Sequence, residues 1–89
     1  METWKWYVYI IECNDNTFYT GMTWKPDVRW IQHVLGSGSR YTGKRGAKRV
    51  VYLEEYENID EARRRERQIK DWSQAKKKKL ISGQWGKWA

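Results

Sequence analysis

The chain has 89 residues and a formal net charge of +7, with 18 Lys and Arg residues against 11 Asp and Glu residues. This length predicts a single domain over residues 1–89 with a modest core over about 4–82. One cysteine and one histidine exclude an internal disulfide and a zinc cluster of Cys and His ligands. The positive charge favours a polyanionic partner, either nucleic acid or an anionic membrane surface.

The N-terminal segment METWKWYVYII is too short an apolar run for a signal peptide or a membrane span. A lone cysteine is typical of proteins in a reducing compartment. We therefore expect a soluble cytoplasmic protein with no membrane partner.

Residues 4–13 are rich in aromatic and β-branched side chains, and their apolar residues fall at both parities. This pattern predicts a strand that is buried on both faces and central in its sheet. Asn14–Asn16 favours a turn, and the predicted returning strand spans Thr17–Thr23.

A three-residue turn would set the register of these two strands. Residue 9 would pair with 21 and residue 11 with 19, so Tyr9 and Tyr19 would share one face of the sheet. Gly21 would lie opposite Tyr9 and leave open space beside its ring.

Pro26 and Gly36 suit the start and the end of a helix over about 26–35. The apolar stripe of this helix consists of Val28, Ile31 and Leu35. Arg29 and His33 are spaced i, i+4, so they project from one side of the helix. A pair with this spacing is more often a solvated face than a site.

The segment Gly36–Arg49 is rich in glycine, basic and free of acidic residues, so we expect a loop. Its glycines would let backbone amides approach phosphate groups. The expected nucleic-acid contacts are Arg40, Lys44, Arg45, Lys48 and Arg49, with Tyr41 stacking on a base. This segment supports nucleic-acid binding but not catalysis.

A third strand is predicted over Val50–Tyr56, followed by two helices. The first of these helices has Asn58 or Asp60 as its N-cap, and the second begins after Ser73 and ends at Gly83.

The run Lys76–Lys79 is expected to be a solvated helix face. The tail over 83–89 contains Trp85 and Trp88, which we expect to pack back on the body. Together the elements predict an α+β fold, with a small three-stranded antiparallel sheet flanked by helices in the order β-β-α-β-α-α.

Glu66 falls inside the apolar stripe of the second predicted helix, between Ala62 and Ile69. A carboxylate on a buried face needs a partner, because an unpaired buried charge is costly. That partner is either an arginine in a structural salt bridge or a divalent cation. No second inward carboxylate is evident, which argues against a two-metal mechanism.

Hydrolysis of a phosphodiester needs a base for water, a cation for the phosphate charge and help for the leaving oxygen. Tyr19 could be the base if nearby positive charge stabilises its phenolate, and Arg29 could hold the phosphate oxygens. Glu66 could hold one Mg²⁺ or Mn²⁺ whose other ligands are water and substrate.

The pattern resembles the GIY-YIG endonuclease superfamily. The two signature triplets of that family correspond to Tyr7-Val8-Tyr9 and Tyr19-Thr20-Gly21, and its helix arginine and metal-binding glutamate fall at Arg29 and Glu66. Over roughly residues 4–82 the chain is similar to the small stand-alone branch, which is related to the catalytic subunit of nucleases that cut branched DNA.

The resemblance implies the three-stranded fold, with Tyr9 and Tyr19 on the active face of the sheet. It implies that Tyr19 is the general base and that Tyr9 orients water or the metal shell. It also implies that Arg29 contacts the scissile phosphate and that Glu66 binds the metal.

His33 would belong to the site, either taking a proton or positioning a phosphate, and Gly21 would leave room for the phosphodiester. Met22 stands where some members have a lysine, so Lys25 or Lys44 would have to supply that extra cation.

These observations predict a metal-dependent DNA endonuclease, structure-selective or weakly sequence-specific, that acts in DNA repair or recombination. Branched, flap or single-stranded regions are its expected substrates, and a protein partner could supply specificity. Two alternatives stay open. One is a nucleic-acid-binding module of the same fold with little or no catalysis, and the other is a structural protein whose tryptophan-rich tail docks a partner.

Overall fold

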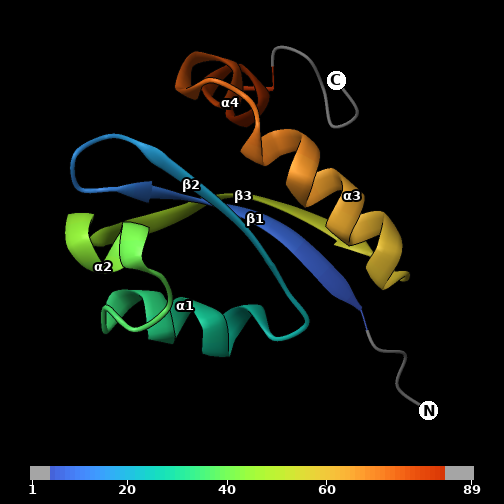
Figure 1. Ribbon diagram of the computed structural model, residues 1–89, viewed down its shortest axis with the longest axis horizontal. Helices are drawn as coiled ribbons and strands as arrows, with labels where there is room; N and C mark the ends of the chain where they lie inside the picture. The colour runs from blue at the N-terminus through green and yellow to red at the C-terminus, as the bar shows by residue number, and fades with distance from the viewer. Residues whose placement is uncertain (1–4, 84–89) are drawn as a thin grey trace.

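The segments that combine aromatic and β-branched residues form one antiparallel sheet with helices on both sides (Figure 1). The computed structural model describes residues 5–83. In this range the elements are β1 (Trp6–Cys13), β2 (Phe18–Thr23), α1 (Pro26–Val34), α2 (Arg40–Arg45), β3 (Ala47–Tyr56), α3 (Ile59–Lys70) and α4 (Gln74–Ile81). The predicted α+β fold is confirmed, with α2 as an additional short helix. The predicted packing of Trp85 and Trp88 lies outside the described residues.

β1 is the central strand, in the order β2-β1-β3, as its apolar residues at both parities predict. Tyr9 pairs with Gly21 and Ile11 pairs with Tyr19, so the predicted register is confirmed. The turn closes through the Cys13 N–H, which donates to the Thr17 carbonyl at 2.8 Å. Tyr9 and Tyr19 therefore lie on one face of the sheet.

The two faces of the sheet are covered by different helices (Figure 1). On the side of α3 and α4 the buried cluster consists of Val8, Ile10, Tyr56, Ala62, Ile69 and Leu80. On the side of α1 and α2 it consists of Tyr9, Ile11 and Cys13, with Tyr19, Trp30 and Tyr41 packed against them. Alternate residues of β1 thus serve opposite layers, and Tyr9 faces α1 and α2.

The prediction of a loop throughout Gly36–Arg49 is wrong, because α2 forms inside this segment and β3 begins at its end. Ser39 is the N-cap of α2, and its Oγ accepts a hydrogen bond from the Thr42 backbone N–H at 3.1 Å. Gly46, with φ +82°, ends the helix. The Ser39 cap and the Gly46 stop are both visible in the sequence. The segment nevertheless read as a loop because it is rich in glycine, and one glycine, Gly43, lies inside the helix.

α1 begins at Pro26 as expected, but its apolar stripe is turned outward. Val28, Ile31 and Leu35 are 43%, 56% and 75% exposed. The face toward the sheet holds His33, which is 1% exposed. Tyr9 projects under α1 and offers a hydrogen bond, so a polar side chain is stable at this buried position.

A second inward carboxylate, contrary to expectation, is present in Glu54 of β3. Its side chain is fully buried, and it binds Arg65 of α3 through N–H···O contacts of 3.0–3.2 Å. The hydroxyls of Tyr52 and Tyr56 donate to the same carboxylate at 2.5 Å each. Because Glu54 pairs with Val8, it lies on the face opposite Tyr9 and serves the core rather than the face that Tyr9 occupies.

α4 satisfies the outer edge of β2 through polar side chains. Gln74 accepts a hydrogen bond from the Phe18 N–H at 2.6 Å and donates to its carbonyl at 3.3 Å. Lys77 donates to the same carbonyl at 3.5 Å and is 5% exposed, so the expected solvated face of Lys76–Lys79 is wrong at this residue.

Candidate active site

Tyr9 and His33 meet on the face of the sheet that α1 covers. The Tyr9 hydroxyl and Nε2 of His33 are 2.8 Å apart, and the two residues are 4% and 1% exposed. Arg29, one turn earlier on α1, is half-buried. The i, i+4 pair of Arg29 and His33 is therefore not a solvated helix face.

Two glycines make room for this pair. A Cβ atom on Gly21 would lie 2.6 Å from Cζ of Tyr9, and one on Gly38 would lie 2.6 Å from Nδ1 of His33. The space beside Gly21 is thus filled by the end of the Tyr9 ring, and it is not open room for a phosphodiester. No pattern in the sequence singles out Gly38, because only the path of the chain after α1 brings it against His33.

Burial sets the protonation of both groups. Burial and the nearby Arg29 charge lower the pKa of His33 to about 4, so its ring is neutral at physiological pH. Burial also raises the pKa of the Tyr9 phenol, and the Glu66 carboxylate acts in the same direction, while Arg29 opposes them. The pair is therefore a neutral phenol against a neutral imidazole.

Tyr19 extends this site into an aromatic cluster. Its ring centroid lies 6.5 Å from that of Tyr9, 5.4 Å from that of His33 and 5.7 Å from that of Tyr41. The Arg45 guanidinium stacks over Tyr41 at 4.0 Å. Tyr41, expected only as a base-stacking residue, is therefore also a wall of the cluster that contains Tyr9 and Tyr19.

Two hydrogen bonds hold Arg29, which also interacts with the Tyr9 hydroxyl, and within residues 5–83 its guanidinium keeps further donors for an anion. Nη1 donates to Oε1 of Gln32 at 2.9 Å, and Nη2 donates to the Gly38 carbonyl at 2.9 Å. A guanidinium has five N–H donors in a planar fork. Arg29 can thus bind an anion beside Tyr9 without breaking its hydrogen bonds to Gln32 and Gly38.

Glu66 approaches the same cluster from α3. Its side chain is 17% exposed, and Oε2 lies 3.6 Å from Nζ of Lys70, so its protein partner is a lysine and not the arginine considered above. Lys70 Nζ also lies 5.7 Å from the centroid of the Tyr19 ring. Lys70 therefore supplies a cation at the Tyr19 side of the site.

The carboxylate of Glu66 fits a Mg²⁺ or Mn²⁺ ion that takes most of its ligands from water and phosphate oxygens. Within residues 5–83, no group of three or more Cys, His, Asp or Glu side chains is placed to hold a metal ion. The Glu66 carboxylate is therefore the candidate metal ligand of this site.

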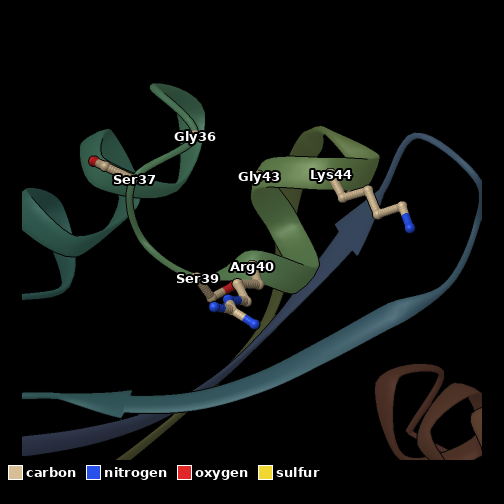
Figure 2. A pocket seen from close by; sticks show the side chains of 6 residues that line it. All are labelled: Gly36, Ser37, Ser39, Arg40, Gly43 and Lys44. Atoms are coloured by element: carbon tan, nitrogen blue, oxygen red, sulfur yellow. The ribbon is translucent and has the colours of Figure 1, made fainter.

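The basic residues of Gly36–Arg49, the segment predicted to be a loop, do not form one cluster. Arg40 and Lys44 line a cavity of about 540 Å³ together with Gly36, Ser37, Ser39 and Gly43 (Figure 2). In Figure 2 the Arg40 side chain lies beside Ser39, whereas Lys44 extends away from it. Arg45 forms an ion pair with Asp15 at 2.9 Å, and Lys48 is exposed on β3.

Comparison with known proteins adds an independent observation. Residues 5–79 match the family model described as the GIY-YIG catalytic domain. A UPF0213 protein of Staphylococcus haemolyticus is 43% identical over 86% of this chain and 94% of its own length. A UPF0213 protein of Natronomonas pharaonis is 38% identical over 90% and 94% of the two chains.

A solved structure is similar as well. The solution NMR structure of a UPF0213 protein from Bacillus halodurans has 41% sequence identity and a TM-score of 0.57, covering 88% of this chain and 83% of the other. No helix within residues 5–83 has the length and apolar character needed to cross a bilayer.

Proposed function

Because this chain belongs to the GIY-YIG family of nuclease-type domains, we propose that it is a metal-dependent DNA endonuclease that hydrolyses phosphodiester bonds. The observation that carries the proposal is the Tyr9–His33 hydrogen bond, with the Arg29 guanidinium beside it. A buried phenol, a neutral base and an anchored cation are the groups that water activation at a phosphate requires.

The hydrogen bond favours a division of roles between the two tyrosines. His33 is neutral, so Nε2 can take the Tyr9 proton while the Tyr9 oxygen takes a proton from water. The water oxygen bonds to phosphorus as the bond from phosphorus to the leaving oxygen breaks. The leaving oxygen takes a proton from solvent, and His33 returns its proton to solvent. We accordingly assign the general base to the Tyr9–His33 pair, whereas the resemblance alone would give that role to Tyr19.

Tyr19, Arg29 and Glu66 complete the proposed site. Tyr19 would orient the attacking water or the phosphate from the cluster wall, and Arg29 would bind a non-bridging phosphate oxygen. Glu66 would hold one Mg²⁺ or Mn²⁺, which when bound supplies positive charge for the phosphate. Gly21 keeps Tyr9 in place.

The proposed substrate is DNA with branched, flap or single-stranded regions, cut in repair or recombination in the cytoplasm. Arg40, Lys44, Arg45 and Lys48 would contact the phosphate backbone, with Tyr41 beside a base. Contacts of this type recognise backbone and shape rather than base edges, so a protein partner could supply specificity.

The test is a cleavage assay on labelled duplex, flap, fork and junction DNA with Mg²⁺ or Mn²⁺. We expect cleavage by the wild-type protein and its loss in Tyr9→Phe and Glu66→Ala proteins of unchanged fold. Cleavage that survives both substitutions would contradict the assignment of Tyr9 and Glu66 to the active site. Salt-sensitive binding without cleavage would favour the alternative of a nucleic-acid-binding module with weak or no catalysis.

A further inference from the structure

A chain of hydrogen bonds runs behind the His33 ring, away from Tyr9. Nδ1 of His33 lies 2.7 Å from Oγ1 of Thr42, which in turn lies 2.9 Å from Oγ of Ser39. Thr42 has 0% exposed surface. The Ser39 hydroxyl lies at the N-cap of α2 and the Thr42 hydroxyl in its first turn, and Ser39 Oγ also accepts a hydrogen bond from the Thr42 N–H.

The hydrogen bonds at the two ring nitrogens together select the tautomer of His33. A neutral imidazole has one N–H donor and one acceptor nitrogen. The buried O–H of Tyr9 needs an acceptor, and within residues 5–83 the structure gives it Nε2 of His33. Nε2 is then the unprotonated nitrogen, and Nδ1 carries the proton.

We infer that Thr42 is a positioning residue for His33: its Oγ1 accepts the Nδ1–H and thereby holds the Nε2 lone pair toward Tyr9. Thr42 has one hydroxyl proton, and Ser39 Oγ is placed to accept it, which leaves the Thr42 oxygen free to accept from His33. This role rests on the proposed function, in which His33 takes the Tyr9 proton.

The opposite tautomer would disable that step. With the proton on Nε2, the ring would donate to the Tyr9 oxygen and could not accept the phenol proton. Gly38 reinforces the orientation, because its missing side chain lets the ring lie within reach of Thr42. Thr42, in the first turn of α2, thus orients His33 for the proton transfer at Nε2, on the opposite side of the imidazole ring.

The single histidine of the chain makes the tautomer directly measurable. In ¹⁵N-labelled wild-type protein near neutral pH, without substrate, long-range ¹H–¹⁵N correlation should show Nδ1 as the protonated nitrogen and Nε2 as the bare one. Thr42→Val keeps the branched shape but removes the acceptor, so a mixture of tautomers is expected. Thr42→Ser should restore the wild-type pattern.

Thr20→Val is the matched control for this spectrum. Thr20 is also buried, and its hydroxyl has no hydrogen-bond partner within residues 5–83. Its substitution should leave the His33 signals unchanged. An Nε2–H tautomer in the wild type, or a Thr42→Val spectrum identical to it, would overturn the inference; if Thr42→Val does not fold, the wild-type tautomer alone decides.

Cleavage assays separate this inference from the proposed function. Thr42→Val should slow cleavage by up to about tenfold, the effect of losing one hydrogen bond, and Thr42→Ser should recover most of the rate. A wild-type rate in Thr42→Val overturns the positioning role. Absence of cleavage by the wild type, with the Nδ1–H tautomer present, overturns the proposed function instead and leaves the orientation of the ring by Thr42 standing.

Discussion

Tyr9 and His33, 24 residues apart in the chain, share a 2.8 Å hydrogen bond where neither residue is more than 4% exposed. Two aliphatic side chains would fill the same space without needing any partner. The bond instead links β1 to α1 through a phenol and an imidazole, and it places a proton acceptor against the phenol. A proton acceptor in this position is what the proposed chemistry uses.

Tyr9→Phe should reduce cleavage by about a hundredfold or more, because a positioned general base contributes that much. The fold should survive, since the ring remains and only one hydroxyl is removed. Rates under single-turnover conditions and circular dichroism measure the two effects.

Tyr7→Phe is the control for this substitution on the same strand, because Tyr7 donates to Glu55 at the protein surface, at 3.4 Å. Its rate should stay near that of the wild type. If Tyr19→Phe abolishes cleavage while Tyr9→Phe does not, Tyr19 is the base and the assignment to Tyr9 fails.

Gly21→Ala should displace the Tyr9 ring, since the new Cβ would lie 2.6 Å from Cζ. We expect a loss of stability of about 1–3 kcal/mol, as for other overpacked sites, with a larger loss of cleavage, at least about tenfold. Urea unfolding and cleavage rates give both values. In a Tyr9→Phe background the same substitution should add little to the loss of cleavage, and full additivity would contradict the mechanism.

The buried neutral state of His33 predicts a pH dependence of stability. Its pKa of about 4 lies below the ordinary value of 6.5, so the unfolded chain binds the proton more readily. Stability from this group is therefore present above pH 6.5 and is lost as pH falls toward 4, by roughly 3 kcal/mol at most.

Urea unfolding of the wild type and of His33→Gln between about pH 7 and pH 4 tests this expectation. The stability advantage of the wild type should shrink as the pH falls. Carboxylates titrate in both proteins, so only the difference between them reports on His33. A difference that stays constant with pH would show that His33 is not held neutral.

Arg65→Met should destabilise the protein by about 3–5 kcal/mol, because it leaves the buried Glu54 carboxylate without its cation. The matched control is Arg49→Met on β3, whose 2.7 Å pair with Glu12 involves a side chain that is 66% exposed. That change should cost at most about 1 kcal/mol. Equal effects in urea unfolding would contradict the central role given to the buried pair.

Arg40→Gln and Lys44→Gln should each lower the salt dependence of DNA binding if the cavity of Figure 2 contacts phosphates. Each lost contact should reduce the slope of log K against log salt by about 0.7–0.9. Fluorescence anisotropy without metal measures it. Lys78→Gln on α4, in the opposite layer, should leave the slope unchanged, and an equal decrease there would indicate unspecific attraction.

The strands and their register could be predicted from the sequence because their causes are local. Apolar residues at both parities marked β1 as central, and the odd-length turn at 14–16 placed Tyr9 and Tyr19 on one face. The Ser73 cap and the glycine-terminated ends of the helices were equally local.

The buried face of α1 could not be predicted in this way. The apolar pattern predicted that Val28 and Ile31 face the sheet, but both side chains are exposed. Which face of a helix is buried also depends on the partners that the neighbouring strand offers. Tyr9 offered His33 a hydrogen bond, and that interaction depends on where β1 lies under the helix.

Patterns within single segments were enough to predict the family resemblance, the central place of β1 and the candidate residues Tyr9, Tyr19, Arg29, His33 and Glu66. Contacts between segments came only from the folded structure, which shows Thr42 behind His33, Gly38 against its ring and the buried Glu54–Arg65 pair. Spacing along one element predicts the face on which a side chain lies. Hydrogen bonds between elements depend on ångström-scale packing that no single segment encodes.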